Sequence, residues 1–223
     1  MRAVVPDVDI LVVDDDSPDG TGEWADERAT TDDQVFVIHR AAKQGLGAAY
    51  LAAFAWALER GYDVVVEMDA DGSHRPEDLP KILAEAENYD LVIGSRWVPG
   101  GSVVNWPPHR KFLWTNANRY VRLALGVPIK DATAGFRSYQ TPLLRRLALG
   151  QVESQGYCFQ IDMAWRVLLA GGTVTEVPIT FVERDAGASK MSGAIVREAL
   201  VKVTWWGVQR VFRGRRRART QGA

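Results

Sequence analysis

Two aspartates separated by one residue, Asp69 and Asp71, follow directly on an apolar run at residues 64–68. Carboxylates at positions i and i+2, where a strand opens into a loop, can both face one hard divalent cation that holds a diphosphate. The alternative is an ordinary acidic turn, because Asp-Gly is common turn chemistry and Asp-x-Asp often arises by chance. The pair alone leaves both interpretations open.

The elements around this pair are short apolar runs that alternate with helical patterns. Strands are predicted at residues 9–13, 35–38, 64–68 and 91–93, and helices with 3.6-residue periodicity at 46–60 and 76–88. Crossover helices between short apolar strands favour a parallel sheet, and ligands of such sheets collect at the carboxyl ends of the strands. A second acidic cluster, which includes Asp14 and Asp15, closes the first strand, so two acidic strand ends are expected at one sheet edge.

Composition and length limit the possible classes of protein. The chain has 223 residues, which suits one domain, and it is 47% hydrophobic and 25% charged, as soluble globular proteins are. Cys158 is its one cysteine, so an internal disulfide framework is excluded and a reducing compartment is expected. No run of about 18 apolar residues and no signal-peptide pattern is present, so no membrane-spanning segment or export by that route is expected.

Charge is distributed unevenly along the chain, although the net charge is −1. From Arg197 onward the sequence has eight basic residues and one acidic residue, whereas residues 1–196 have 19 basic and 27 acidic residues. This pattern does not indicate nucleic-acid binding. It indicates a basic tail that would bind another polyanion, such as a membrane surface.

The order of motifs resembles a known enzyme family. The matching segments are residues 12–21, 45–50, 69–79, 94–101, 131–137, 156–163 and 182–191. Together they resemble the family-2 glycosyltransferases of GT-A fold, specifically the dolichol-phosphate or polyprenol-phosphate mannose synthases, over roughly residues 8–192. The resemblance implies an α/β, Rossmann-like three-layer fold with a central, mostly parallel sheet. A dinucleotide-binding dehydrogenase is disfavoured, because no Gly-x-Gly-x-x-Gly follows the first strand.

The resemblance implies a role for each matching residue on the donor side. Asp69 and Asp71 would hold Mg²⁺ or Mn²⁺ against the diphosphate of GDP-mannose, with Asp71 essential for catalysis. Asp14 and Asp15 would contact the nucleoside. Residues Arg184 and Lys190 would belong to a loop that closes over the donor phosphates.

The same resemblance implies an acceptor side built from arginines. Arg96, Arg110 and Arg137 would act in catalysis by positioning a polyprenyl monophosphate, whose oxygen is already anionic and needs no strong base. A single displacement would invert the anomeric carbon and give a β-linked polyprenyl-phosphate-mannose. The enzyme would lie at the cytoplasmic face of a membrane as a peripheral protein.

Two segments could contact that membrane. Residues 104–127 mix large apolar groups with arginines, so they predict either an interfacial helix or an ordinary core-packing helix. The division expected is a catalytic domain at 1–194 and an amphipathic, basic helix and tail at 195–223. The tail could anchor on anionic lipid or dock on a membrane-spanning partner protein.

Some features depart from the family pattern. Residues 1–7 resemble only the last turn of the family's first helix, so the first strand and helix are expected to be missing. Ser73 stands where relatives often have a glutamine, and Trp114 stands where many have a small polar residue. Two alternatives stay open: transfer of glucose or an aminosugar, and an inactive, truncated homologue that acts as a binding module.

Overall fold

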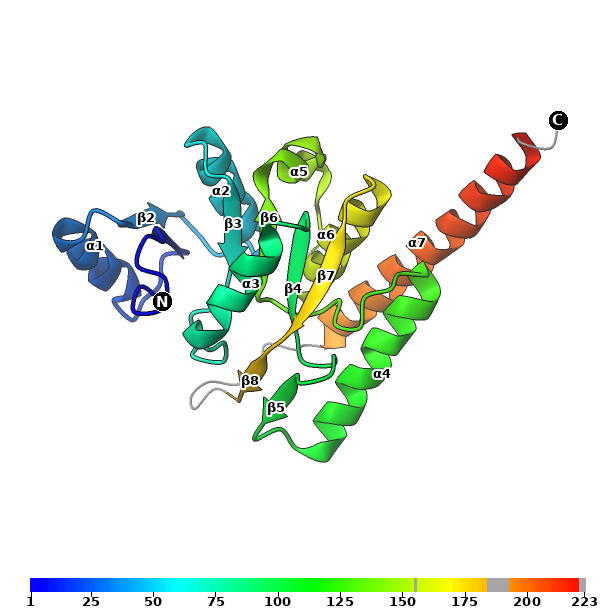
Figure 1. Ribbon diagram of the computed structural model, residues 1–223, viewed down its shortest axis with the longest axis horizontal. Helices are drawn as coiled ribbons and strands as arrows, with labels where there is room; N and C mark the ends of the chain where they lie inside the picture. The colour runs from blue at the N-terminus through cyan, green and yellow to red at the C-terminus, as the bar shows by residue number, and fades with distance from the viewer. Residues whose placement is uncertain (155, 184–192, 221–223) are drawn as a thin grey trace.

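The computed structural model describes residues 1–154, 156–183 and 193–220, and Figure 1 shows its elements. The strands are β1 (Ile10–Asp14), β2 (Val35–His39), β3 (Val64–Glu67), β4 (Leu91–Ser95), β5 (Ser102–Val104), β6 (Arg137–Gln140), β7 (Val174–Pro178) and β8 (Thr180–Val182). The helices are α1 (Thr21–Thr31), α2 (Leu46–Glu59), α3 (Leu79–Ala86), α4 (Pro108–Leu125), α5 (Thr141–Arg146), α6 (Gly156–Leu169) and α7 (Gly193–Thr220). Two short 3₁₀ turns are η1 (Pro76–Asp78) and η2 (Leu149–Gln151).

The central sheet has four strands in the order β3-β6-β4-β7. Its β4 and β7 run parallel, whereas β6 runs antiparallel to both β3 and β4, so this sheet is mixed rather than mostly parallel. The α/β class is confirmed. Because β6 reads Arg-Ser-Tyr-Gln, it lacks the apolar run that marks the other strands, and periodicity did not predict it.

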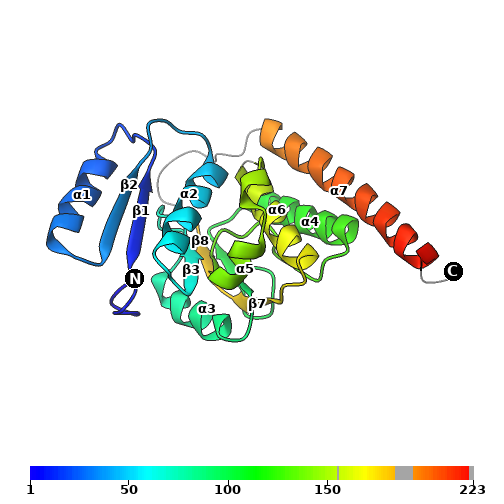
Figure 2. The same cartoon turned by 90° about the horizontal axis from the view of Figure 1, so that it is seen from above.

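Strands β1 and β2 form a separate parallel pair that is not hydrogen-bonded to the central sheet. With α1 they lie at one end of the molecule, and α7 lies at the other (Figure 2). Among the strands that the structure describes, β1 pairs with β2 alone and β3 pairs with β6 alone. The expectation of one sheet that contains all four predicted strands is therefore corrected.

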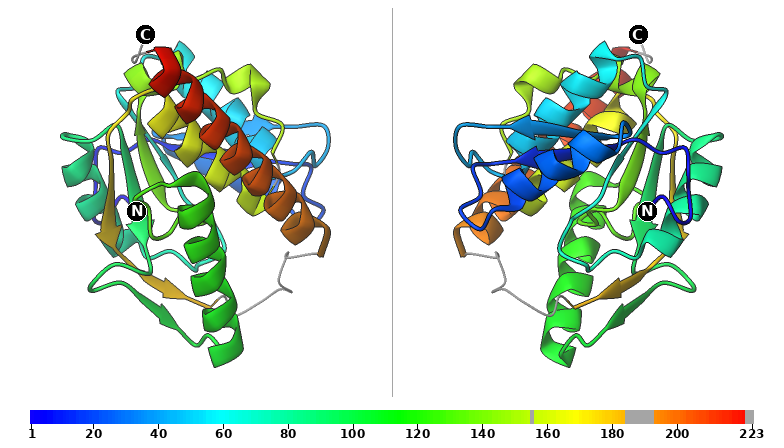
Figure 3. Two further views of the ribbon diagram at one scale, coloured as in Figure 1. Left: turned by 90° about the vertical axis from the view of Figure 1, so that its right-hand side faces the viewer. Right: turned by 90° about the vertical axis from the view of Figure 1, so that its left-hand side faces the viewer.

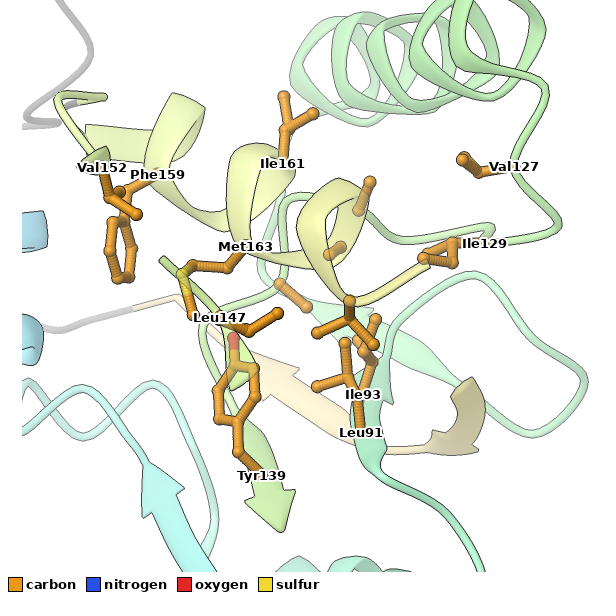
Figure 4. Packing of buried hydrophobic residues seen from close by; sticks show 14 of the residues in the cluster. Leu91, Ile93, Val127, Ile129, Tyr139, Leu147, Val152, Phe159, Ile161 and Met163 are labelled. Atoms are coloured by element: carbon orange, nitrogen blue, oxygen red, sulfur yellow. The ribbon is translucent and has the colours of Figure 1, made fainter. Parts of the chain in front are cut away.

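Alternation along β4 directs side chains to two hydrophobic clusters on opposite faces of the central sheet. Leu91 and Ile93 join the larger cluster with α4, α5 and α6, and Tyr139 of β6 lies among them (Figure 4). Val92 joins the smaller cluster, where α3 supplies Leu79 and Ile82. The sheet is thus covered on both faces, which makes three layers and fixes the strand ends that carry the candidate site.

Helices α4 and α7 lie side by side on one side of the molecule (Figure 3). Tyr120 on α4 and Thr204 on α7 share a hydrogen bond of 2.6 Å between their hydroxyl oxygens. A Cβ on Gly207 would lie 2.9 Å from the carbonyl oxygen of Ala124, so a glycine lets the helices approach closely. Val203 is buried in the larger cluster, so α7 packs onto the body of the protein.

Candidate active site

Asp69 and Asp71 lie in the turn after β3, where Gly72 has a φ of +75° that favours glycine. The Tyr50 hydroxyl, whose pKa burial raises well above its ordinary value, donates to Asp69 Oδ1 at 3.3 Å. Asp71 Oδ1 accepts the backbone N–H of Ser73 at 3.1 Å and also its hydroxyl. Local hydrogen bonds thus orient both carboxylates.

His74 stabilises the same turn through its imidazole ring. Its Nδ1 accepts the backbone N–H of Asp69 at 3.2 Å, which places the ring proton on Nε2. The ring packs against Phe136 and Phe181, and burial lowers its pKa, so the imidazole is neutral at pH 7. A neutral, buried histidine in this position supports the loop rather than transferring protons.

The donor atoms at this turn suit a hard divalent cation. Carboxylate oxygens are the ligands that Mg²⁺ and Mn²⁺ prefer, and an ideal Cβ on Gly135 would lie 3.4 Å from Asp69 Oδ2, so glycine keeps that oxygen approachable. Over the described ranges, no three His, Cys, Asp or Glu residues form a metal-binding group. Two carboxylates fit an ion that takes its remaining ligands from a diphosphate and water.

Asp14 and Asp15, the expected nucleoside contacts, lie at the carboxyl end of β1 in the separate two-stranded unit. Asp14 is buried and accepts the backbone N–H of Ser17 at 3.3 Å, and hydrogen bonding from Ser17 lowers its pKa. Asp15 pairs with Arg40 at 2.8 Å. Arg40, which sequence analysis missed, also donates its backbone N–H to the Asp14 carbonyl at 2.8 Å.

Arg96 is held in a buried ion pair with Asp131. Its Nε and Nη2 donate to the two carboxylate oxygens at 2.7 Å each, and its backbone N–H donates to Oδ2 at 3.0 Å. Burial opposes ionisation of Asp131, but Arg96 holds the pKa of that carboxyl below its usual value. The guanidinium also lies 5.4–5.8 Å from four aromatic ring centroids, those of Trp97, Trp106, Trp114 and Phe181.

Arg110 lies at the start of α4, close to the same aromatic cluster. Its guanidinium carbon is 4.4 Å from the Trp106 ring centroid, and Nη1 donates to Glu183 Oε1 at 2.6 Å. The side chain keeps 20% of its exposure, so it can reach an incoming phosphate. The Trp106 ring lies near both Arg110 and Arg96, and it contacts the ring of Trp114, which also lies near Arg96.

Arg137 lies inside the core and is not brought to the expected acceptor site. Its guanidinium donates at 2.7 Å to the carbonyl oxygens of Ala132, Ala134 and Gln160. Its Nε is 3.7 Å from Glu67 Oε1, and both side chains are fully buried. Because its donors are satisfied by backbone, Arg137 braces the segment after Asp131 rather than presenting charge to a phosphate.

Burial beside Arg137 raises the pKa of the Glu67 carboxyl to about 8, although the charge of Arg137 opposes the shift. Glu67, Tyr50 and His74 were not predicted as site residues, because in the sequence each is part of an ordinary strand, helix or turn. Arg184 and Lys190, the expected loop residues, lie outside the described residues. The structure places the expected metal residues after β3 and the expected nucleoside residues at the end of β1. The expected acceptor arginines lie on three further segments, after β4, on α4 and on β6.

The helices that the structure describes include none that is both long and apolar enough to cross a bilayer. The expected interfacial helix, α4, has a buried face with Trp114, Val121 and Leu125 and an outer face that exposes Phe112 and Leu123. The core-packing interpretation is thus confirmed for the buried face. The interfacial interpretation stays a prediction for the outer face.

Comparison with known proteins identifies relatives of this chain. Residues 4–148 match the family described as Glycosyl transferase family 2. An undecaprenyl-phosphate mannosyltransferase of Micrococcus luteus is 56% identical over 216 residues, which cover 97% of this chain and 89% of the relative. A polyprenol monophosphomannose synthase of Mycolicibacterium smegmatis is 58% identical over 206 residues, which cover 92% and 78%.

Solved structures confirm the GT-A type of fold. Glucosyl-3-phosphoglycerate synthase from Mycobacterium tuberculosis, solved with Mn²⁺, UDP-glucose and phosphoglyceric acid, superposes with a TM-score of 0.67. It is 17% identical and the match covers 92% of this chain and 72% of that one. The same enzyme with Mg²⁺ and UDP gives a TM-score of 0.64 at 18% identity, over 91% and 72%. At such identity the likeness concerns the fold.

Proposed function

The chain belongs to glycosyltransferase family 2, and from that premise we propose that it transfers mannose from GDP-mannose to a polyprenyl monophosphate. The observation that carries the proposal is the 56% and 58% identity to two relatives named for mannosyl transfer to such lipids. The product is a polyprenyl-phosphate-mannose, a lipid-linked donor for further glycan or glycolipid assembly.

The reaction is one inverting displacement. An anionic oxygen of the acceptor phosphate attacks the anomeric carbon of mannose, and the bond from that carbon to the donor phosphate oxygen breaks. GDP leaves with the electron pair. No side chain needs to remove a proton, because the attacking oxygen is already charged near neutral pH. The protein therefore acts by positioning two anions and by stabilising the charge on the leaving group.

The donor diphosphate lies beside Asp69 and Asp71 in this proposal. Mg²⁺ or Mn²⁺ bound there neutralises the diphosphate and so improves it as a leaving group. The hydrogen bonds from Tyr50 and Ser73 hold the carboxylates in one geometry before substrate arrives. Asp14 and Asp15 contact the nucleoside, and Arg184 and Lys190 neutralise the donor phosphates.

Arg110 binds the acceptor phosphate. In the absence of substrate its charge is balanced by Glu183, and a phosphate with two oxygens competes for the same guanidinium. Arg96 acts indirectly, because Asp131 holds its guanidinium, which lies 5.5 Å from the Trp106 ring centroid. Arg137 positions the segment of residues 132–134, whose carbonyls it holds, rather than binding phosphate itself.

We assign residues 1–194 to catalysis and residues 195–223 to membrane association. In support, α7 exposes Leu200, Val201 and Trp205 and ends in a run of arginines. Such a helix can contact anionic lipid at the cytoplasmic face, as a peripheral protein, or a membrane-spanning partner.

A transfer assay tests the proposal. Purified protein is incubated with Mn²⁺, a short polyprenyl phosphate and radiolabelled GDP-mannose, and lipid-extracted label is counted beside reactions with UDP-glucose and a UDP-aminosugar. We expect label to be extracted with the lipid when GDP-mannose is the donor. This label should be lost when Asp71→Asn replaces the wild type. Higher transfer from another sugar nucleotide would replace mannose by that sugar. No transfer from any donor, with calorimetric binding of GDP-mannose retained, would indicate a binding module.

A further inference from the structure

A cavity of about 170 Å³ opens beside α4. Six residues line this cavity: Trp97, Thr115, Asn118, Arg119, Arg122 and Lys130. Thr115, Asn118, Arg119 and Arg122 follow one another at intervals of three or four, so they share one face of the helix. Trp97 and Lys130 close the cavity from two loops that are joined by the hydrogen bond from the Arg96 backbone N–H to Asp131 Oδ2.

The cavity concentrates positive charge. Arg119, Arg122 and Lys130 are all exposed, and no ion pair joins any of them to a carboxylate within the described ranges. The nearby carboxylate of Glu176 is already bound by two backbone amides, those of Lys130 at 2.7 Å and Asp131 at 2.8 Å. Three cations around one small cavity, none of them ion-paired to a carboxylate among the described residues, favour an anionic ligand.

An aromatic side chain completes the wall of the cavity. Trp97 lines it together with the three cations. The N–H groups of two arginines and one lysine match the acceptor oxygens of a phosphate.

The surface next to the cavity is apolar. Phe112 is 72% exposed and Leu123 is 68% exposed, and they lie seven residues before and four residues after Arg119 on α4. They therefore share the outward side of the helix with that arginine. A water-soluble phosphate compound would gain nothing from these side chains, whereas a phospholipid offers both a phosphate and acyl chains.

The cavity adjoins the buried Arg96–Asp131 pair, although none of the expected site residues lines it. Asn118, which is only 3% exposed, forms part of the wall and donates to Thr133 Oγ1 at 3.2 Å. From the opposite side, Arg96 Nη2 donates to the same oxygen at 3.0 Å. The shared Thr133 thus fixes the distance between the cavity and the buried Arg96–Asp131 pair. A phosphate in the cavity would hold α4 in one orientation toward the site.

We propose that the cavity formed by Trp97, Arg119, Arg122 and Lys130 binds the headgroup phosphate of an anionic membrane phospholipid, with Phe112 and Leu123 inserted beside it. The lipid is a docking ligand and not the mannose acceptor. Its binding sets the start of α4, where Arg110 lies, against the membrane surface that supplies the acceptor. The inference rests on the proposed function, since a lipid acceptor is what requires this orientation.

Vesicle sedimentation of the full chain tests the inference. Vesicles of phosphatidylcholine alone are compared with vesicles that contain 30% phosphatidylglycerol, each at about 0.1 M salt. The test variant is Arg119→Gln/Arg122→Gln, and the matched control is Arg28→Gln/Arg60→Gln, which removes the same charge from exposed arginines of α1 and α2's end. We expect the wild type to bind the anionic vesicles, with about tenfold weaker binding for the test variant and less than twofold for the control.

Three results would overturn the proposal. Equal weakening in both variants would mean that total charge decides binding. Equal binding of wild type to both vesicle types would show that the interaction does not require an anionic headgroup. Saturable binding of inorganic phosphate that the test variant loses, with vesicle binding unchanged, would assign the cavity to a soluble ion.

A second measurement separates this inference from the proposed function. Mannosyl transfer to a short acceptor in detergent, without vesicles, should stay within twofold of wild type in Arg119→Gln/Arg122→Gln. Loss of that activity together with vesicle binding would place the two arginines in the reaction site and overturn the docking role. Absence of transfer in the wild type would contradict the proposed function alone, because vesicle binding is read independently.

Discussion

The buried ion pair of Arg96 and Asp131 gives the sharpest test of the structure. Asp131→Ala removes a carboxylate that accepts three hydrogen bonds from Arg96, at 2.7, 2.7 and 3.0 Å. The guanidinium stays enclosed by aromatic rings and keeps 5% of its exposure. It has Thr133 Oγ1 as its remaining acceptor side chain, so a full charge is left without compensation.

The expected loss is large because an unpaired charge, rather than one hydrogen bond, is left in the core. Removing one partner of a buried pair typically lowers the free energy of unfolding by about 3–5 kcal/mol. For a chain of this length that loss corresponds to a fall in Tm of roughly 6–20 °C. The partly exposed pair of Lys202 and Glu198 on α7 is the contrast, since Lys202→Gln should lower the free energy of unfolding by about 0.5 kcal/mol or less.

Urea unfolding followed by tryptophan fluorescence measures these free energies. A double variant, Arg96→Met/Asp131→Ala, completes the cycle, because replacing both charges by apolar groups removes the unpaired charge. It should therefore lose less than the sum of Arg96→Met and Asp131→Ala. A loss below about 1 kcal/mol for Asp131→Ala, or strict additivity in the cycle, would refute a dry, tightly coupled pair at this position.

Further predictions concern the site, the tail and the thiol. Asp71→Ala should lower transfer at least about a hundredfold while the Tm shifts little, because the side chain is exposed and its turn is local; normal activity would remove Asp71 from the metal site. Arg110→Ala should raise the apparent KM for the polyprenyl phosphate far more than that for GDP-mannose, and equal effects would place Arg110 outside the acceptor site. Deleting residues 213–223, which leaves the buried Val203 in place, should weaken liposome binding at low salt, and unchanged partitioning would argue against anchoring by the tail. Burial raises the pKa of Cys158 to about 12, so the thiol stays protonated at pH 8 and should react with a disulfide reagent only after unfolding; rapid native labelling would contradict the burial.

Local sequence was enough to predict most of the elements. The apolar runs at β1, β2, β3 and β4 and the periodic helix α2 agree with the structure to within a few residues. Each is encoded within a single short window, because burial of one face produces a regular spacing of apolar residues. Strand β6 was missed because its polar residues are accommodated by tertiary partners: Arg137 by backbone carbonyls and Tyr139 by the larger hydrophobic cluster.

The position of the acidic turn and the family were also accessible from sequence alone. Asp69 and Asp71 lie two and four residues after the end of β3, so their placement depends on local chain geometry. The order of seven motifs identified the glycosyltransferase family, and the family match and the relatives confirm it.

Only the tertiary structure decided what the arginines do. Arg96, Arg110 and Arg137 looked equivalent in sequence, since each is a cation in a motif. Packing gave them different partners: a buried carboxylate for Arg96, an accessible one for Arg110 and backbone carbonyls for Arg137. Likewise, Arg119 and Arg122 became a candidate phosphate site only when Trp97 and Lys130 were brought beside them. The position of a residue in the sequence determines which helix, strand or loop carries it. The effect of its charge depends on neighbours that are distant in the sequence, and only folding brings those neighbours beside it.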